Sequence, residues 1–197
     1  MPATVSLDAI KELREKTGAG VSDCRKALQE TGGQMEKAAE LIRRRGEDKA
    51  AQKADRQTRN GIVDAYIHMD GRIGVLIEVN CETDFVARTD DFRRFVRDAA
   101  MQVAAMNPVC ISREEVPGDR LEHERKGLAA ELQGKPPQIA ERIASGKLEK
   151  LYQQICLLDQ PFIKDDSMTI AAYLKSIIAK TGENIVIKRF VRFQLGG

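Results

Sequence analysis

The sequence contains no tryptophan, and aromatic residues make up only 5% of its 197 residues, so a hydrophobic core must be built from Leu, Ile, Val and Ala. No apolar run approaches the ~20 residues that a helix needs to cross a membrane. The charge is balanced, since 32 Lys and Arg against 30 Asp and Glu leave a formal net charge of +2. This balance excludes a strongly basic nucleic-acid module or an acidic tail as the whole protein, but not a local charged patch.

Cysteines are few and far apart: the chain has no CxxC pair and no cysteine beside a histidine. This spacing is poor for a metal site and unlike a disulfide framework, so we expect free thiols and a reducing environment. The first 16 residues meet charged side chains before the apolar stretch of a signal peptide forms. Both observations predict a cytoplasmic protein. The four cysteines are Cys24, Cys81, Cys110 and Cys156.

Motifs for catalysis and for nucleotide binding are missing as well. The chain has no GxxxxGK[ST] loop and no strand-linked GxGxxG, and Gly18-Ala19-Gly20 is more simply explained as a turn between two helices. The two histidines, His68 and His123, have no Cys or Ser nucleophile beside them in the sequence. We therefore expect no catalytic residue, no metal and no cofactor.

The chain opens with a pattern that predicts a bundle of three short helices over residues 1–46. Apolar residues recur at helical spacing in the first helix, which Gly18 should end because glycine accepts positive φ. We expect Ser22 to cap the second helix and the third helix to end near Gly46. Three helices this short bury little surface, so the bundle is marginal alone.

Residues 47–60 are polar, rich in alanine and free of Pro and Gly, which predicts an exposed connecting helix. From Arg43 to Arg59 there are seven basic and three acidic residues, a local net charge of +4. Such a charge run is usually a solvated face. The alternative is contact with phosphate or with an acidic partner surface.

Residues 61–197 predict an α+β core. Alternating apolar residues indicate strands over 62–69, 72–80 and 184–195. Asp70-Gly71 between the first two is the dipeptide that favours a type I′ hairpin turn. Three such strands predict a small antiparallel sheet with one covered face.

The chain between the second and third strands is predicted to be helical. An apolar stripe from Phe92 to Met106 provides the cover for the sheet, and Pro108 ends it. Ser112-x-x-Glu115 is typical of a capping box and should open the first arm of a protruding helical hairpin at about 112–157. A last helix near 168–180 leads into the third strand.

The segment Asn80 to Arg88, NCETDFVAR, leaves the second strand through an acidic turn. One hypothesis packs Phe85 and Val86 under the following helix and gives Thr83 and Asp84 turn and capping roles. The other holds the acid and the aromatic ring outward, as an anchor for a pocket on a partner. The pattern alone favours the packed arrangement.

Two long segments resemble the signatures of the bacterial elongation factor Ts family. They are LREKTGAGVSDCRKAL, from Leu13 to Leu28, and EVNCETDFVAR, from Glu78 to Arg88. The segments GKPPQIAERIASGKLEK, DQPFIKDD, GENIVIKRF and RFQLGG look like the same family, so the resemblance covers essentially the whole chain. One departure is Arg25, which stands where the family usually has Lys and is not an equivalent donor.

The resemblance implies a guanine nucleotide exchange factor for elongation factor Tu, without covalent catalysis. It makes residues 1–46 a UBA-like domain that docks on the partner's GTPase domain. It also implies that the TDFV element promotes exchange, with its Phe wedged between helices of the partner near the magnesium site. The implied exchange element is Thr83, Asp84, Phe85 and Val86, and the implied N-terminal contacts are Leu13, Arg14, Thr17, Gly18, Ala19, Gly20 and Val21.

Longer bacterial members of this family carry two copies of the core subdomain, and this sequence has room for one. The short form predicts a homodimer with the sheet in its interface and a two-plus-two complex with elongation factor Tu, with neither DNA nor a membrane as a partner. The alternative is an RNA-binding or ribosome-associated translation protein, for which the basic segment and Lys188, Arg189 and Arg192 would form a phosphate-contacting face.

Overall fold

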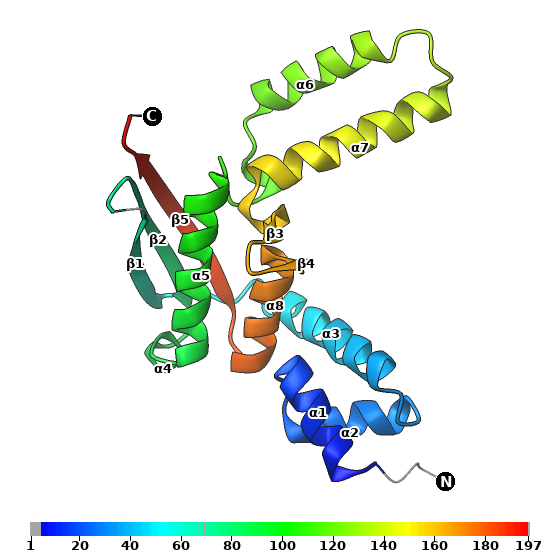
Figure 1. The fold of residues 1–197 in the computed structure, drawn as a ribbon, viewed down its shortest axis with the longest axis vertical. Helices are drawn as coiled ribbons and strands as arrows, with labels where there is room; N and C mark the ends of the chain where they lie inside the picture. Colours follow the sequence, from blue (N-terminus) through cyan, green and yellow to red (C-terminus); the bar gives the residue numbers. More distant parts are fainter. Residues whose placement is uncertain (1–4, 69, 197) are drawn as a thin grey trace. The chain divides into compact units, whose positions relative to one another are not determined.

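The structure, a computed structural model, describes residues 5–68 and 70–196 (Figure 1). The fold is α+β, as predicted from the sequence. The chain divides into two compact units. One comprises the chain as far as Ile62 together with 80–93 and 174–186, and the other comprises 63–79, 94–173 and 187–197.

The first unit begins with the predicted three-helix bundle, α1 (Leu7–Thr17), α2 (Val21–Glu30) and α3 (Met35–Ala51). Gly18 ends α1 as predicted: its φ is +67°, and its N–H donates to the Arg14 carbonyl. The bundle fits the UBA-like description that the resemblance implied. Its buried core consists of Ile10, Leu13, Cys24, Ala27, Leu28 and Ala38.

Two details of the predicted bundle are wrong. Gly20, in extended conformation, is the N-cap of α2, and Ser22 is the second residue of the helix. The third helix does not end near Gly46 but continues to Ala51, so residues 47–60 are not a separate helix. Gly46 serves a close approach instead, because a Cβ at this position would lie 3.2 Å from the Cβ of Ala179 on α8 (Ile170–Thr181).

The predicted sheet is confirmed, with β1 (Asn60–His68), β2 (Ile73–Cys81) and β5 (Ile185–Gln194) in the antiparallel order β1-β2-β5. Both Asp70 and Gly71 have positive φ, as a type I′ turn requires. Met69, the predicted last residue of the first strand, lies outside the described residues. The N–H of Leu195 donates to the Arg72 carbonyl at 2.9 Å, so the end of β5 lies beside the start of β2.

In the second unit, one sheet face is covered by α5 (Asp90–Met106). Arg97 reaches from α5 to the Ala65 carbonyl, and Arg192 donates to the Ala104 carbonyl of α5. The opposite face carries exposed apolar side chains, because alternate residues of a strand point to opposite faces. In β5 the alternation of burial changes phase at Lys188 and Arg189, and beyond that point Arg192 marks the face that α5 covers. These are Val63, Ile67, Leu76, Val191, Phe193 and Leu195.

The helical hairpin is also confirmed, with α6 (Gly118–Glu131) and α7 (Pro137–Ile155) as its arms (Figure 1). The capping box is wrong, because the Ser112 side chain caps nothing and the Glu115 carboxylate accepts from the N–H of Ile111. A short 3-10 helix, η1 (Arg113–Glu115), stops at Val116 because Pro117 forces the preceding residue into extended backbone.

The hairpin base is closed by a bridge between Cys110 and Cys156, whose free thiols are buried 3.6 Å apart. The chain then passes through η2 (Leu157–Asp159) and a small two-stranded sheet that sequence patterns missed, β3 (Pro161–Phe162) and β4 (Asp165–Thr169). Strands of two and five residues are too short for alternation to reveal.

Candidate partner-binding site

The segment after β2 folds into one helical turn, α4 (Asp84–Ala87), within the first unit. Thr83 is its N-cap, in extended conformation, and its Oγ1 accepts the N–H of Val86 at 3.4 Å. The capping role suggested by the sequence is therefore confirmed for Thr83. Residues 83–86 are called the 83–86 turn below.

The two apolar residues of the 83–86 turn have opposite environments. Phe85 is 77% exposed, whereas Val86 is only 8% exposed. Successive residues of a helix point about 100° apart, so one turn cannot bury both against the same neighbours. The hypothesis that both are packed is right for Val86 and wrong for Phe85. Asp84 is half-exposed and pairs with Arg88 at 2.7 Å, which leaves an aromatic ring beside a carboxylate at the surface.

The 83–86 turn is held by residues that lie 100 positions away in the sequence. The Thr83 N–H donates to Oε2 of Glu183 at 3.0 Å, and the Thr83 hydroxyl donates to Oε1 at 2.6 Å. In the reverse direction, the N–H of Asn184 donates to the carboxylate of Glu82 at 2.7 Å. The two segments therefore hold each other through side-chain carboxylates.

Sequence reasoning assigned no role to Glu183 or Asn184, although both lie in the GENIVIKRF segment. A signal was present, because antiparallel pairing of β2 with β5 places the residues after β2 opposite those before β5. What the pattern could not show is that the carboxylate of Glu183 accepts both donors of Thr83.

Cys81 lies behind the 83–86 turn, fully buried, and its Sγ donates to the Thr83 carbonyl at 3.1 Å. Burial, with a smaller contribution from the negative charge of Glu183, raises the pKa of this thiol to about 11. The thiol therefore stays protonated at neutral pH and acts as a buried hydrogen-bond donor rather than as a nucleophile.

The predicted N-terminal contact residues cluster at the turn from α1 to α2. Leu13 is fully buried in the bundle core, and its carbonyl accepts the Thr17 hydroxyl at 2.6 Å. The Ala19 N–H donates to the same Thr17 oxygen at 3.3 Å, which stiffens the turn. The others at the surface are Arg14, Gly18, Gly20 and Val21, the last 45% exposed.

The described part of the chain offers no group of three or more His, Cys, Asp or Glu side chains suited to a metal ion. Nδ1 of His68 is hydrogen-bonded to the Tyr66 hydroxyl at 2.9 Å, and the two rings stack. Within the same described residues, no helix combines the length and apolar character needed to cross a bilayer.

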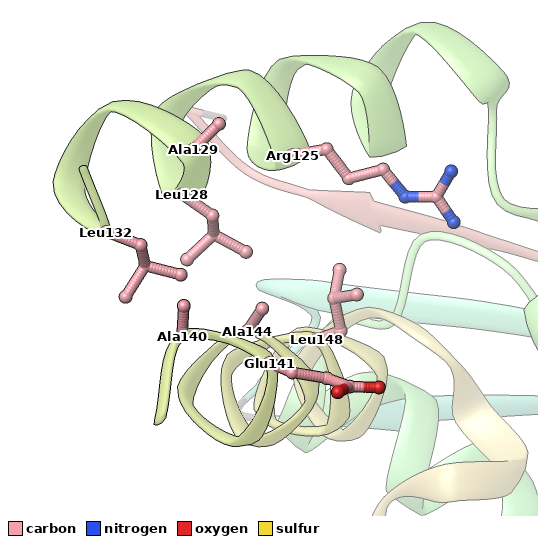
Figure 2. Close-up of a pocket in the computed structure, with 8 residues that line it drawn as sticks. All are labelled: Arg125, Leu128, Ala129, Leu132, Ala140, Glu141, Ala144 and Leu148. Atoms are coloured by element: carbon pink, nitrogen blue, oxygen red, sulfur yellow. The ribbon is translucent and has the colours of Figure 1, made fainter. Parts of the chain in front are cut away.

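A pocket of about 400 Å³ lies between the arms of the hairpin in the second unit. Figure 2 shows Leu128 of α6 and Leu132, the residue after α6, pointing toward Ala140 and Ala144 of α7. Of the residues that the structure describes, those that line the pocket include none of the predicted site residues. The lining is mainly apolar, with Arg125 and Glu141 at its margin. The pocket is therefore a packing gap of the hairpin and adds nothing to the 83–86 turn.

The chain is similar to known proteins over nearly its whole length. Residues 6–197 match the family model described as "Elongation factor TS". The chain is 55% identical over 194 residues to "Elongation factor Ts" of Thermoanaerobacter sp. (strain X514), covering 98% of this chain and 95% of that protein. It is 51% identical over 192 residues to "Elongation factor Ts" of Thermotoga petrophila, covering 98% and 96%.

The raised pKa of Cys81 predicts slow alkylation in the folded chain. A shift from 9.0 to about 11 leaves about 100-fold less thiolate at pH 8, and burial restricts access further. Iodoacetamide labelling, with peptides assigned by mass spectrometry, should therefore modify Cys81 at least about 100-fold more slowly than in the urea-unfolded chain. Equal rates in the two states would contradict the buried, hydrogen-bonded thiol.

Proposed function

Because the chain belongs to the elongation factor Ts family, we propose that it binds the GDP form of elongation factor Tu and promotes GDP release, which allows GTP to be reloaded. The proposal depends most on one observation, the exposure of Phe85 on a turn whose other residues are held in place. As a translation elongation factor, the chain needs a surface for its partner rather than a catalytic group.

Nucleotide exchange requires that the GTPase bind GDP more weakly, and a side chain inserted as a wedge beside the nucleotide site can cause this. A GTPase holds GDP through backbone amides on the phosphates and through Mg²⁺, so displacing these elements weakens many contacts at once. Binding of factor and nucleotide is coupled reciprocally, and coupling of about 3 kcal/mol changes each affinity about 150-fold. Burying an exposed aromatic side chain on the partner contributes about 1.5–3 kcal/mol, which is of the same size.

Each residue of the 83–86 turn has its own role in the proposed exchange. Phe85 supplies the apolar wedge, and Asp84 supplies a surface carboxylate beside it. Thr83 caps the turn, and Val86, buried in the free chain, anchors the turn to the core. No covalent bond is made or broken, so the proposed activity is exchange without covalent catalysis.

The N-terminal bundle supplies a second contact, on the partner's GTPase domain. We propose domains at 1–46 and 61–197 joined by 47–60, although α3 runs into the joining segment. At the α1–α2 turn the contact surface is formed by Arg14, Thr17, Gly18, Ala19, Gly20 and Val21, while Leu13 supports it from the core. The cytoplasm, where translation takes place, is the proposed location.

Ion pairs within the chain weaken the RNA-binding alternative. Carboxylates of the bundle and of Glu82 pair with four of the seven basic residues of the segment, and the Lys53 ammonium donates to the Gly182 carbonyl. In the last strand, Arg189 pairs with Glu78 and Arg192 donates to α5. The pairs of the basic segment are Arg43–Glu47, Arg45–Glu30, Lys49–Asp23 and Arg56–Glu82.

The exposed apolar face of the sheet supports the proposed homodimer. An apolar patch of this kind on a surface marks an interface, and a two-fold dimer buries the same patch of both subunits. Phe193, 68% exposed, and Leu76 lie on this face, opposite the one covered by α5. A second copy of this chain is the proposed occupant, and it gives a two-plus-two complex with elongation factor Tu.

Replacing Phe85 with alanine tests the proposed exchange function. In a stopped-flow measurement of fluorescent GDP release from elongation factor Tu, the wild-type chain should accelerate release, and Phe85→Ala should slow this acceleration about tenfold or more. The melting temperature should stay unchanged, because the ring is exposed in the free chain.

Val86→Ala provides the contrasting variant, since removing two buried methyl groups should lower the free energy of unfolding by about 1–2 kcal/mol. Unfolding of Phe85→Ala would identify Phe85 as a core residue, and full exchange activity of that variant would remove the wedge.

Charge placed on the exposed sheet face tests the homodimer. Light scattering of the wild-type chain at micromolar concentration should give twice the mass of one chain, and Phe193→Glu should give a monomer because the carboxylate would be buried. Gln194→Glu is the matched control, since it adds the same charge at the next residue, which points to the other face. A monomeric wild type, or a Phe193→Glu variant that remains dimeric, would contradict the interface.

A further inference from the structure

We propose that Glu183 is a positioning residue for nucleotide exchange, which holds the 83–86 turn in the conformation that presents Phe85. The inference rests on the proposed exchange function and extends it to a residue that makes its contacts within the chain. Glu183 lies between α8 and β5, in the same unit as the 83–86 turn.

The carboxylate of Glu183 binds Thr83 at two points. Oε2 accepts the backbone N–H of Thr83 at 3.0 Å, and Oε1 accepts the hydroxyl at 2.6 Å. Both bonds are charge-assisted, and a single carboxylate fixes the backbone and the side chain of one residue together. Thr83 therefore has neither a free backbone orientation nor a free hydroxyl rotor.

The fixed hydroxyl carries the effect into the turn. A hydroxyl has one proton to donate and lone pairs to accept with. Because the proton of Thr83 Oγ1 points to Glu183, a lone pair remains for the N–H of Val86, at 3.4 Å. The series of bonds from Glu183 through Thr83 to Val86 fixes the N-terminal end of α4. The Thr83 carbonyl also accepts the N–H of Ala87 at 3.3 Å, so the position of Phe85 within α4 depends on the orientation of Thr83.

The backbone on either side of Glu183 is anchored by other groups. Asn184, which is buried, donates its side-chain N–H groups to the carbonyls of Ala54 and Arg56 and its backbone N–H to Glu82. The Gly182 carbonyl accepts the Lys53 ammonium. Changing the side chain of Glu183 therefore removes the hold on Thr83 while these contacts keep the segment in place.

Glutamine at position 183 is the sharpest substitution, because it keeps the size of the side chain and removes one acceptor. A carboxylate accepts at both oxygens, whereas an amide offers one oxygen and one NH2 group. In Glu183→Gln the NH2 group can only donate, so either the backbone N–H of Thr83 loses its acceptor or the Thr83 hydroxyl must turn its proton away from residue 183, and neither bond remains charge-assisted. Asp91→Asn is the matched control: it removes a carboxylate of the same unit that pairs with Lys180 and is not bonded to the 83–86 turn.

The test is fluorescent GDP release from elongation factor Tu, measured against factor concentration to separate the maximal rate from the half-saturating concentration. Glu183→Gln should lower the maximal rate about tenfold, since a small misplacement of a positioned group has effects of this size or larger. Asp91→Asn should release GDP at the wild-type rate, and both variants should keep the melting temperature of the wild type within a few degrees.

A double-mutant cycle separates positioning from general stability. In a Phe85→Ala background, Glu183→Gln should slow release no further, because the group that it positions is absent. Equal slowing in both backgrounds would contradict a role through Phe85. If Glu183→Gln does not fold, Thr83→Val removes the hydroxyl from the other side of the same bond and should also slow release.

The outcomes distinguish this inference from the proposed function. A wild-type chain that leaves GDP release unchanged overturns both. Acceleration by the wild type together with wild-type rates for Glu183→Gln, or for Thr83→Val where that variant replaces it, overturns only the role of Glu183.

Discussion

The pairing of β2 with β5 is the constraint on which the candidate site depends. Antiparallel pairing places the end of β2 beside the start of β5, so Glu82 and Thr83 meet Glu183 and Asn184 across 100 residues of sequence. Carboxylates on both segments accept N–H groups of the other, and Cys81 supports Thr83 from behind. The surface position of Phe85 is a consequence of contacts that it does not itself make.

The exposure of the Phe85 ring in the free chain favours rapid, reversible binding to a partner. A wedge that is already in position loses little conformational entropy on binding, because the turn behind it is ordered in the free chain. The balanced charge of the chain, +2 in total, fits a protein that binds another protein and is released in each cycle. Half of the basic residues that suggested a phosphate-binding face form ion pairs within the chain instead.

Much of this fold could be predicted because its elements are long and regular. The strands, the α5 stripe and the hairpin arms follow from periodicity, and Gly18 follows from its need for positive φ. Predictions failed where contacts beyond the local pattern matter: Gly46 lies inside α3, where its missing Cβ lets α8 approach closely, and Pro117 breaks the helix expected after Ser112. Periodicity could not separate Phe85 from Val86 in a single turn, and it carries no information on Glu183, whose role depends on a contact between distant segments.

In the proposed complex Phe85 itself enters a pocket of elongation factor Tu, and site-specific photo-crosslinking tests this contact most directly. A chain carrying benzoylphenylalanine at position 85 is illuminated with GDP-bound elongation factor Tu, and the crosslinked peptide is identified by mass spectrometry. The control carries the same group at Ile139, an exposed apolar position on α7. We predict a crosslink from position 85 to the GTPase domain beside the nucleotide site. A chain that still accelerates GDP release but forms no crosslink from position 85 would contradict this account.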